Sequence, residues 1–189
     1  AKTPANVYKC LLDIWTPALN VAKQERDIYQ KMLEKDEPGA KLQPWDWRYY
    51  SEKYRMEKYA IDDAEVRPYF SLDSVREGAF MVANRLYGLT FTERPDLPTY
   101  DKEARCFEVK DGEQTIGILY MDFHPRAIKR SGAWMTEFRG QHIDCKTGEN
   151  VIPIIQVVCN FTKPTADKPS LLNFDECETL FHEFGHALH

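Results

Sequence analysis

The chain has 189 residues, the length of one ordinary domain, and 43% of them are hydrophobic, which is enough to build a buried core. The 25 basic and 30 acidic residues give a formal net charge of -5, and charges of both signs are mixed along the chain. This mixture argues against a nucleic-acid partner and a polybasic membrane surface, and no apolar run approaches the ~20 residues that span a bilayer.

The cysteines are odd in number, widely separated and without a C-x-x-C pair, which favours free thiols over a disulfide framework or a thiolate zinc site. Free thiols are typical of a reducing compartment, so a cytoplasmic location is predicted. The five cysteines are Cys10, Cys106, Cys145, Cys159 and Cys177.

The first ninety or so residues show the spacing of helices. Pro17 is expected to kink the first helix or to start a new one with Thr16 as its N-cap, and Pro38-Gly39 ends it. A second helical stretch is predicted from Asp46 to about Ile61. The apolar face of the first helix consists of Val7, Leu11, Trp15, Ala18, Ala22, Tyr29 and Met32, spaced by three, four or seven positions.

A third helix is predicted from Leu72 to Tyr87. Ser71 before it has the side chain of an N-cap, and Gly88 after it is a typical helix stop. The buried stripe expected for this helix is Val75, Ala79, Val82 and Leu86.

After the third helix the pattern changes to that of strands. Residues 105–109 alternate, Asp111-Gly112 signals a tight turn and residues 115–123 are strand-like, so a β-hairpin is predicted. A loop is expected over 124–150 and a further apolar strand over 151–161. Helices come first, then a small and mostly antiparallel sheet, then a last helix, so the fold class is α+β.

The last element, from Asn173 onward, is predicted to be a helix independently of any motif. Asn173 and Glu176 form a capping-box pattern, and Leu172 with Cys177 fits the hydrophobic contact that accompanies it. On a helical wheel, one sector holds all the polar residues and apolar residues cover the remainder. A simple solvated surface helix would carry Lys, Arg or Gln in that polar sector, and this helix has none.

This helix contains the H-E-x-x-H pattern, from His182 to His186. Residues four apart lie one turn apart on the same face, so the two imidazoles can bind one tetrahedral Zn²⁺. Glu183 flanks the metal without binding it and is placed to act as general base. His182 and His186 are therefore the candidate metal ligands, and Glu183 is the candidate catalytic residue. A catalytic zinc also needs a third protein ligand. His189 lies on the same face and could pose as one, but a last residue frays, so the motif is present without a complete site.

The run from Leu171 to His189 resembles the thimet oligopeptidase family of zinc metallopeptidases. Other stretches agree with that family in order and rough spacing, and the two that follow Phe123 look most like its bacterial peptidyl-dipeptidase (dipeptidyl carboxypeptidase) branch. These stretches are Pro44–Trp47, Tyr49–Lys53, Pro68–Phe70, Leu86–Gly88, Lys129–Trp134 and Cys159–Pro164.

The resemblance implies a two-lobed, mostly helical, zinc-dependent peptidase with one Zn²⁺ per full-length protein, which hydrolyses short peptides and releases C-terminal dipeptides. It implies that this chain is a middle fragment ending just after the motif, with a helical segment 1–90 and a segment 91–189 that carries the sheet and metal-binding helix of one catalytic lobe. The third ligand and the oxyanion donors are then expected outside the chain. The fragment itself is expected to be inactive, with zinc absent or weakly bound.

Three further expectations concern binding. The strand ending at Cys159-Asn160-Phe161 is either the edge strand that pairs with extended substrate or an ordinary core strand. The alternatives to a peptidyl-dipeptidase are an internally cleaving oligopeptidase of the same family and a non-catalytic peptide-binding domain. Self-association of the fragment through exposed apolar surface is expected where apolar side chains lack neighbours.

Overall fold

A computed structural model describes residues 2–60 and 62–189 of the chain. The contacts divide the chain into two compact units, residues 1–62 and residues 63–189. The segments 1–90 and 91–189 stay a prediction about the domains of a larger protein. Within the described residues, no helix combines the length and the apolar character that crossing a membrane requires.

The first unit is a pair of helices with a small aromatic core. It contains α1 (Pro4–Asp36), the short 3-10 helix η1 (Pro44–Asp46) and α2 (Trp47–Tyr59). Trp47 packs edge-on against Tyr29, with the two ring centroids 5.0 Å apart. The predicted end of the second helix, Ile61, lies outside the described residues, and α2 ends at Tyr59. The buried side chains of this unit are Tyr29, Met32, Leu33 and Tyr50, all from the last third of α1 and from α2.

The expectation of a new helix capped by Thr16 is wrong, because α1 is a single helix with Pro17 inside it. The Thr16 hydroxyl donates to the Leu12 carbonyl, at 3.0 Å, instead of capping a helix start. Proline removes one backbone N–H from the helix, and the carbonyl four residues before it, that of Asp13, loses its helical donor. Asp13 is exposed, so water can take that place.

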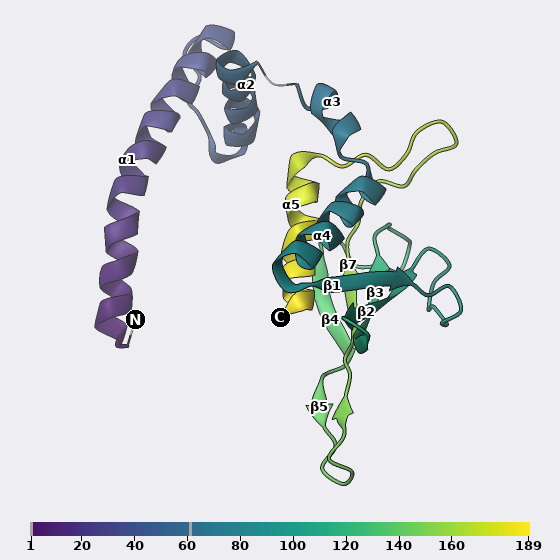
Figure 1. The fold of residues 1–189 in the computed structure, drawn as a ribbon. Coiled ribbons are helices and arrows are strands. Elements are labelled where there is room, and N and C mark those ends of the chain that lie inside the picture. The colour runs from purple at the N-terminus through teal and green to yellow at the C-terminus, as the bar shows by residue number, and fades with distance from the viewer. Residues whose placement is uncertain (1, 61) are drawn as a thin grey trace. The chain divides into compact units, whose positions relative to one another are not determined.

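The second unit contains a five-stranded sheet with the strand order β1-β2-β3-β7-β4, in which only the β3–β7 pair is parallel. Strands β5 and β6 form a separate two-stranded ribbon that extends from the ends of β4 and β7 (Figure 1). This mixed helix-and-sheet unit confirms the α+β class. Its elements are α3 (Asp63–Val66), η2 (Arg67–Tyr69), α4 (Leu72–Tyr87), β1 (Leu89–Glu93), β2 (Arg105–Asp111), β3 (Gln114–Asp122), β4 (Trp134–Arg139), β5 (His142–Ile143), β6 (Asn150–Val151), β7 (Ile154–Val158) and α5 (Phe174–Leu188).

The predicted hairpin is confirmed as β2 and β3, with Gly112 in its turn at a φ of +55°. The predicted loop over 124–150 is wrong, because that segment contains β4, β5 and the first residue of β6. Strand β4 pairs with β7 at the edge of the main sheet. The apolar strand expected over 151–161 is shorter, since β7 covers only Ile154–Val158.

Helix α4 has the predicted ends but not the whole predicted stripe. The Ser71 hydroxyl accepts a hydrogen bond from the Ser74 N–H, at 3.2 Å, and Gly88 ends the helix at a φ of +75°. Val75 and Ala79 are buried as expected, whereas Val82 and Leu86 are exposed. The buried face lies to one side of the predicted stripe and is completed by Leu72, Arg76, Phe80 and Ala83.

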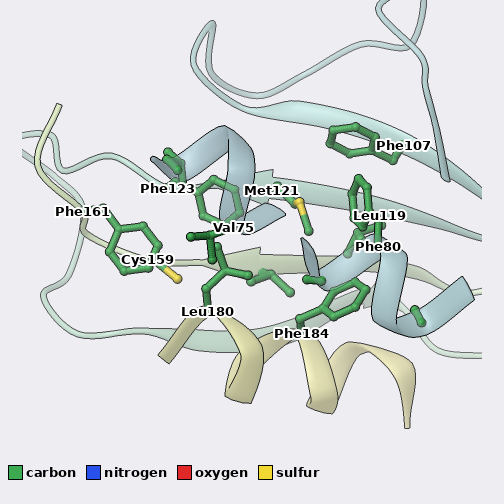
Figure 2. Close-up of a cluster of buried hydrophobic side chains, with 14 of the residues drawn as sticks. Val75, Phe80, Phe107, Leu119, Met121, Phe123, Cys159, Phe161, Leu180 and Phe184 are labelled. Carbon is green, nitrogen blue, oxygen red and sulfur yellow. The ribbon is translucent and has the colours of Figure 1, made fainter. Parts of the chain in front are cut away.

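Helices α4 and α5 cover the same face of the sheet, α4 next to β1 and α5 over β7 and β4 (Figure 1). Between these layers lies the core, in which Leu180 and Phe184 of α5 point at the strands (Figure 2). Phe80 of α4 stacks on Phe91 of β1 with ring centroids 4.2 Å apart. Burying one such side chain is worth about 1.5–3 kcal/mol, so α5 is fixed to the sheet mainly by apolar contact.

Candidate metal centre

Helix α5 begins with the predicted capping box. The Asn173 side chain accepts a hydrogen bond from the Glu176 N–H at 2.7 Å, and the Glu176 carboxylate accepts one from the Asn173 N–H at 2.9 Å. Leu172 before the cap is fully buried and belongs to the same core as Cys177. The cap and the buried core residues together fix where the helix starts and which way it faces, and so set the directions of the H-E-x-x-H side chains.

His182 and His186 are both exposed, and their Nε2 atoms lie 3.1 Å apart. Two nitrogen ligands of one tetrahedral zinc ion stand about 3.3–3.4 Å apart, given zinc–nitrogen bonds of about 2.0–2.1 Å. The observed separation is slightly shorter than this value and is also that of a hydrogen bond between the two rings. The spacing of the two nitrogens is thus compatible with a shared metal ion.

Glu183 lies on a different side of α5 from the two histidines. It is only 9% exposed, whereas the sequence placed it in one polar sector with them. A residue in a helix is rotated by about 100° from its neighbour, which turns Glu183 toward the sheet and close to Cys159. Burial, reinforced by the negative charge of Glu183, raises the pKa of the Cys159 thiol to about 12. Glu183 is thus a carboxylate at the boundary between the core and the histidine face.

The two histidines lack a third metal ligand within the part of the chain that the structure describes. Within residues 2–60 and 62–189, no group of three or more His, Cys, Asp and Glu side chains is arranged to hold a metal ion. His189 caps the helix end through its backbone N–H, which donates to the carbonyls of Gly185 and His186. Its side chain does not complete a ligand cluster with His182 and His186.

A cavity of about 430 Å³ lies beside the C-terminal end of α5. Its walls come from α5, from the sheet face below it and from the edge strand β4. The polar groups in the wall include His186, Glu137 and Gln141, and the apolar ones include Phe91, Met135 and Phe184. A mostly apolar hollow next to one candidate ligand is the kind of space that a substrate side chain fills.

The strand before α5 is not an edge strand, so that expectation is wrong. Strand β7 lies inside the sheet, with β3 on one side and β4 on the other. Its hydrogen-bonding groups are therefore used on both sides, in agreement with the core-strand alternative. The sheet edge nearest α5 is β4, which contacts the helix and pairs on one side only.

Sequence reasoning missed a buried charge cluster around Asp122 at the end of β3. Asp122 is 1% exposed and accepts hydrogen bonds from Arg126, Lys129 and Tyr100. Burial raises the pKa of Asp122, but the bonds from Arg126 and Lys129 outweigh this effect and hold the pKa below its ordinary value. A lone Asp at the end of an apolar strand, followed by Arg and Lys at positions four and seven, was the available signal.

Comparison with known proteins supports the resemblance. A family model described as Peptidase family M3 matches residues 1–189. Dipeptidyl carboxypeptidase of Salmonella typhimurium (strain LT2) is 40% identical over 191 residues, and oligopeptidase A of Escherichia coli (strain K12) is 37% identical over 190 residues. Each match covers 100% of this chain but 28% of the relative. Organellar oligopeptidase A of Arabidopsis thaliana is 42% identical over 149 residues, which is 76% of this chain and 19% of the relative. The chain belongs to peptidase family M3.

Proposed function

We propose that this chain provides the zinc-binding helix of a peptidase, with His182 and His186 as metal ligands and Glu183 as the general base. The observation that carries the proposal is the 3.1 Å separation of the two Nε2 atoms on one exposed face; Glu183 follows His182 in the helix and lies at the boundary of the core. We propose that the third ligand and the oxyanion donors come from elsewhere in a longer protein. A chain that supplies only two imidazoles is expected to hold zinc weakly.

When bound, zinc would polarise the scissile carbonyl and lower the pKa of the attacking water. Glu183 accepts the proton of that water on its carboxylate and passes it to the leaving nitrogen of the peptide. Its position next to the core shields the carboxylate from bulk solvent, and the same shielding strengthens its interaction with a nearby proton donor. The exposed histidines leave room for a substrate over the outer face of α5.

The substrates in this proposal are short, unstructured peptides. An extended peptide can add to the free edge of β4, where main-chain hydrogen bonds give affinity and side-chain pockets give selectivity. Because dipeptidyl carboxypeptidases are among the similar proteins, we propose release of dipeptides from the C-terminus. The five cysteines are all unpaired, which supports a cytoplasmic location.

The catalytic assignment is tested with the longer enzyme that carries this chain. Glu183→Gln should lower kcat by at least about 100-fold while the zinc content stays the same, since it removes the base and leaves both ligands. His182→Ala and His186→Ala should lose the zinc itself. The control is Glu113→Gln, an exposed acid in the turn between β2 and β3, which should keep full activity. Peptide hydrolysis that survives Glu183→Gln would overturn the assignment.

Product analysis separates the two enzyme alternatives. A dipeptide-releasing enzyme should cut two residues from a free C-terminus, and amidation of that terminus should slow it. An internally cleaving oligopeptidase, the reading favoured by the similarity to oligopeptidase A, should be indifferent to the amide. A non-catalytic peptide-binding domain should bind both peptides and cut neither.

A further inference from the structure

The segment between β3 and β4, residues 123–133, has to pass the end of β7, because β7 lies between these two strands in the sheet. The register shows where it passes. Asp122 at the end of β3 is paired with Val158 at the end of β7, and Val158 is paired with Trp134 at the start of β4. The crossing segment therefore determines where the edge strand begins.

The first anchor of the crossing segment is the buried cluster on β3. Arg126 donates two hydrogen bonds to the Asp122 carboxylate, at 2.9 and 2.8 Å, and Lys129 donates one at 2.8 Å. The Lys129 side chain is 2% exposed, and its ammonium also donates to the carbonyls of Asp122 and His124, both at 2.9 Å. All three donors of this ammonium are used, so Lys129 ties the segment to β3 in one geometry.

The second anchor comes from Asn160, the second residue after β7. The Asn160 side-chain amide donates to the carbonyls of Arg130 and Gly132, each at 2.8 Å. Gly132 has a φ of +89°, a conformation that residues with a side chain rarely adopt. The Asn160 side chain thus holds the last residues before β4 through two of their main-chain carbonyls, and Gly132 allows the backbone conformation found there.

A buried ion pair is a costly way to gain stability, because desolvation of the two charges offsets most of their attraction. An apolar pair of similar volume would stabilise a connecting segment at least as much as the ion pair does. A charged and fully hydrogen-bonded anchor does fix one geometry, however, since any other arrangement leaves buried charge without a partner. What the anchors fix is the start of the sheet's free edge.

We infer that Asp122, Lys129 and Asn160 are positioning residues that hold β4 in the register in which its free edge accepts the main chain of an extended peptide. The inference rests on the proposed function, in which such a peptide is the substrate. None of the three residues touches the peptide in this arrangement. They act through the backbone of residues 130–134.

The test measures hydrogen exchange of the β4 amides, Trp134–Arg139, in the enzyme carrying Glu183→Gln, so that an unstructured peptide of about six residues binds without being cut. The bound peptide should slow exchange of the outward-facing β4 amides by about tenfold or more, the effect of about one added hydrogen bond. Adding Lys129→Met or Asn160→Asp should remove most of this protection. With Glu183 intact, the same two variants should raise KM for the peptide about tenfold and leave kcat nearly unchanged.

The matched control is Lys163→Met, which removes a lysine–carboxylate pair of the same 2.8 Å length, to Glu103, outside the crossing segment. It should keep both the protection and the KM. If Lys129→Met does not fold, Asn160→Asp decides alone, because it removes the two donated hydrogen bonds without changing the size of the side chain. If Asn160→Asp lowered kcat and thermal stability as much as it raised KM, its role would be merely structural and the inference would be overturned.

The outcomes separate this inference from the proposed function. An active enzyme whose β4 amides are not protected by bound peptide overturns the inference alone. Protection of β4 in a protein that never hydrolyses peptides overturns the proposed function and leaves the inference standing. If bound peptide protects the β4 amides as strongly in Asn160→Asp as in Lys163→Met, the inference is also overturned.

Discussion

Helices α1 and α5 both carry apolar residues at helical spacing, but α5 buries such residues along its length, whereas α1 buries them only from Tyr29 onward. Leu180 and Phe184 of α5 are 0% and 3% exposed, whereas Leu11 and Trp15 of α1 are 59% and 60% exposed. The sequence predicts a helix with a buried apolar face and one with an exposed apolar face equally well, since the spacing shows only that one face is apolar. Whether a neighbour covers that face depends on the rest of the fold. The α1 stripe gains no stabilisation from within its own unit until Tyr29, where the small aromatic core begins.

The largest expected contrast between the two units is in thiol reactivity. Cys10 of α1 is exposed, whereas Cys159 is fully buried and its environment raises its pKa to about 12. The thiolate is the reacting form, so Cys159 should be labelled at least about a thousandfold more slowly than Cys10 by a thiol reagent at pH 7. Timed labelling followed by peptide mass spectrometry measures both rates. The two rates should converge in denaturant, and equal rates in the native protein would contradict the burial of Cys159.

A second contrast concerns stability. Leu180→Ala should lower the free energy of unfolding by about 2–5 kcal/mol, because it opens a cavity in the core between α5 and the sheet. Leu11→Ala should change it by no more than about 0.5 kcal/mol, because that side chain is already in water. Urea unfolding of the two variants and the parent checks both values. A cost for Leu11→Ala as large as that for Leu180→Ala would show that a neighbour covers the α1 stripe.

The smallest expected effect is on association of the chain. The exposed apolar residues of α1 form a patch that a second copy can cover, so the isolated chain should self-associate weakly. Leu11→Glu should lower the mean mass measured by light scattering at a fixed concentration. Gln24→Glu adds the same charge to the same helix at an exposed polar position and should leave the mass unchanged. A monomeric parent chain would refute this use of the patch.

The parts of the fold that the sequence predicts are those encoded by neighbouring residues. Ser71 and Gly88 mark the ends of α4, and Asn173 with Glu176 marks the start of α5, because a cap is a contact between residues three or four apart. The hairpin of β2 and β3 follows from the Asp111-Gly112 turn. The same local rule would have identified β1, since Leu89, Thr90, Phe91 and Thr92 alternate as strand residues do.

The missed elements depend on distant partners. Strand β4 shows no apolar alternation, because as an edge strand it has only one neighbour and much of it faces water. Its place beside β7 brings together residues more than 15 positions apart, such as Glu137 and Ile155. The candidate site divides in the same way. The spacing of His182 and His186 predicts their approach, but the burial of Glu183 depends on where β7 lies.

The strand order also has a consequence for the sequence of events in folding. Strands β1, β2 and β3 can pair as soon as each is made, since neighbours in the chain are neighbours in the sheet. Strand β4 is synthesised next, before its partner β7. In the folded sheet β7 lies between β3 and β4. Until residues 154–158 leave the ribosome, β3 and β4 both present unpaired edges, and α5 has no complete surface to pack on. Such edges are prone to pair with other chains, so the interval before β7 arrives is the period in which this unit is most exposed to misassembly.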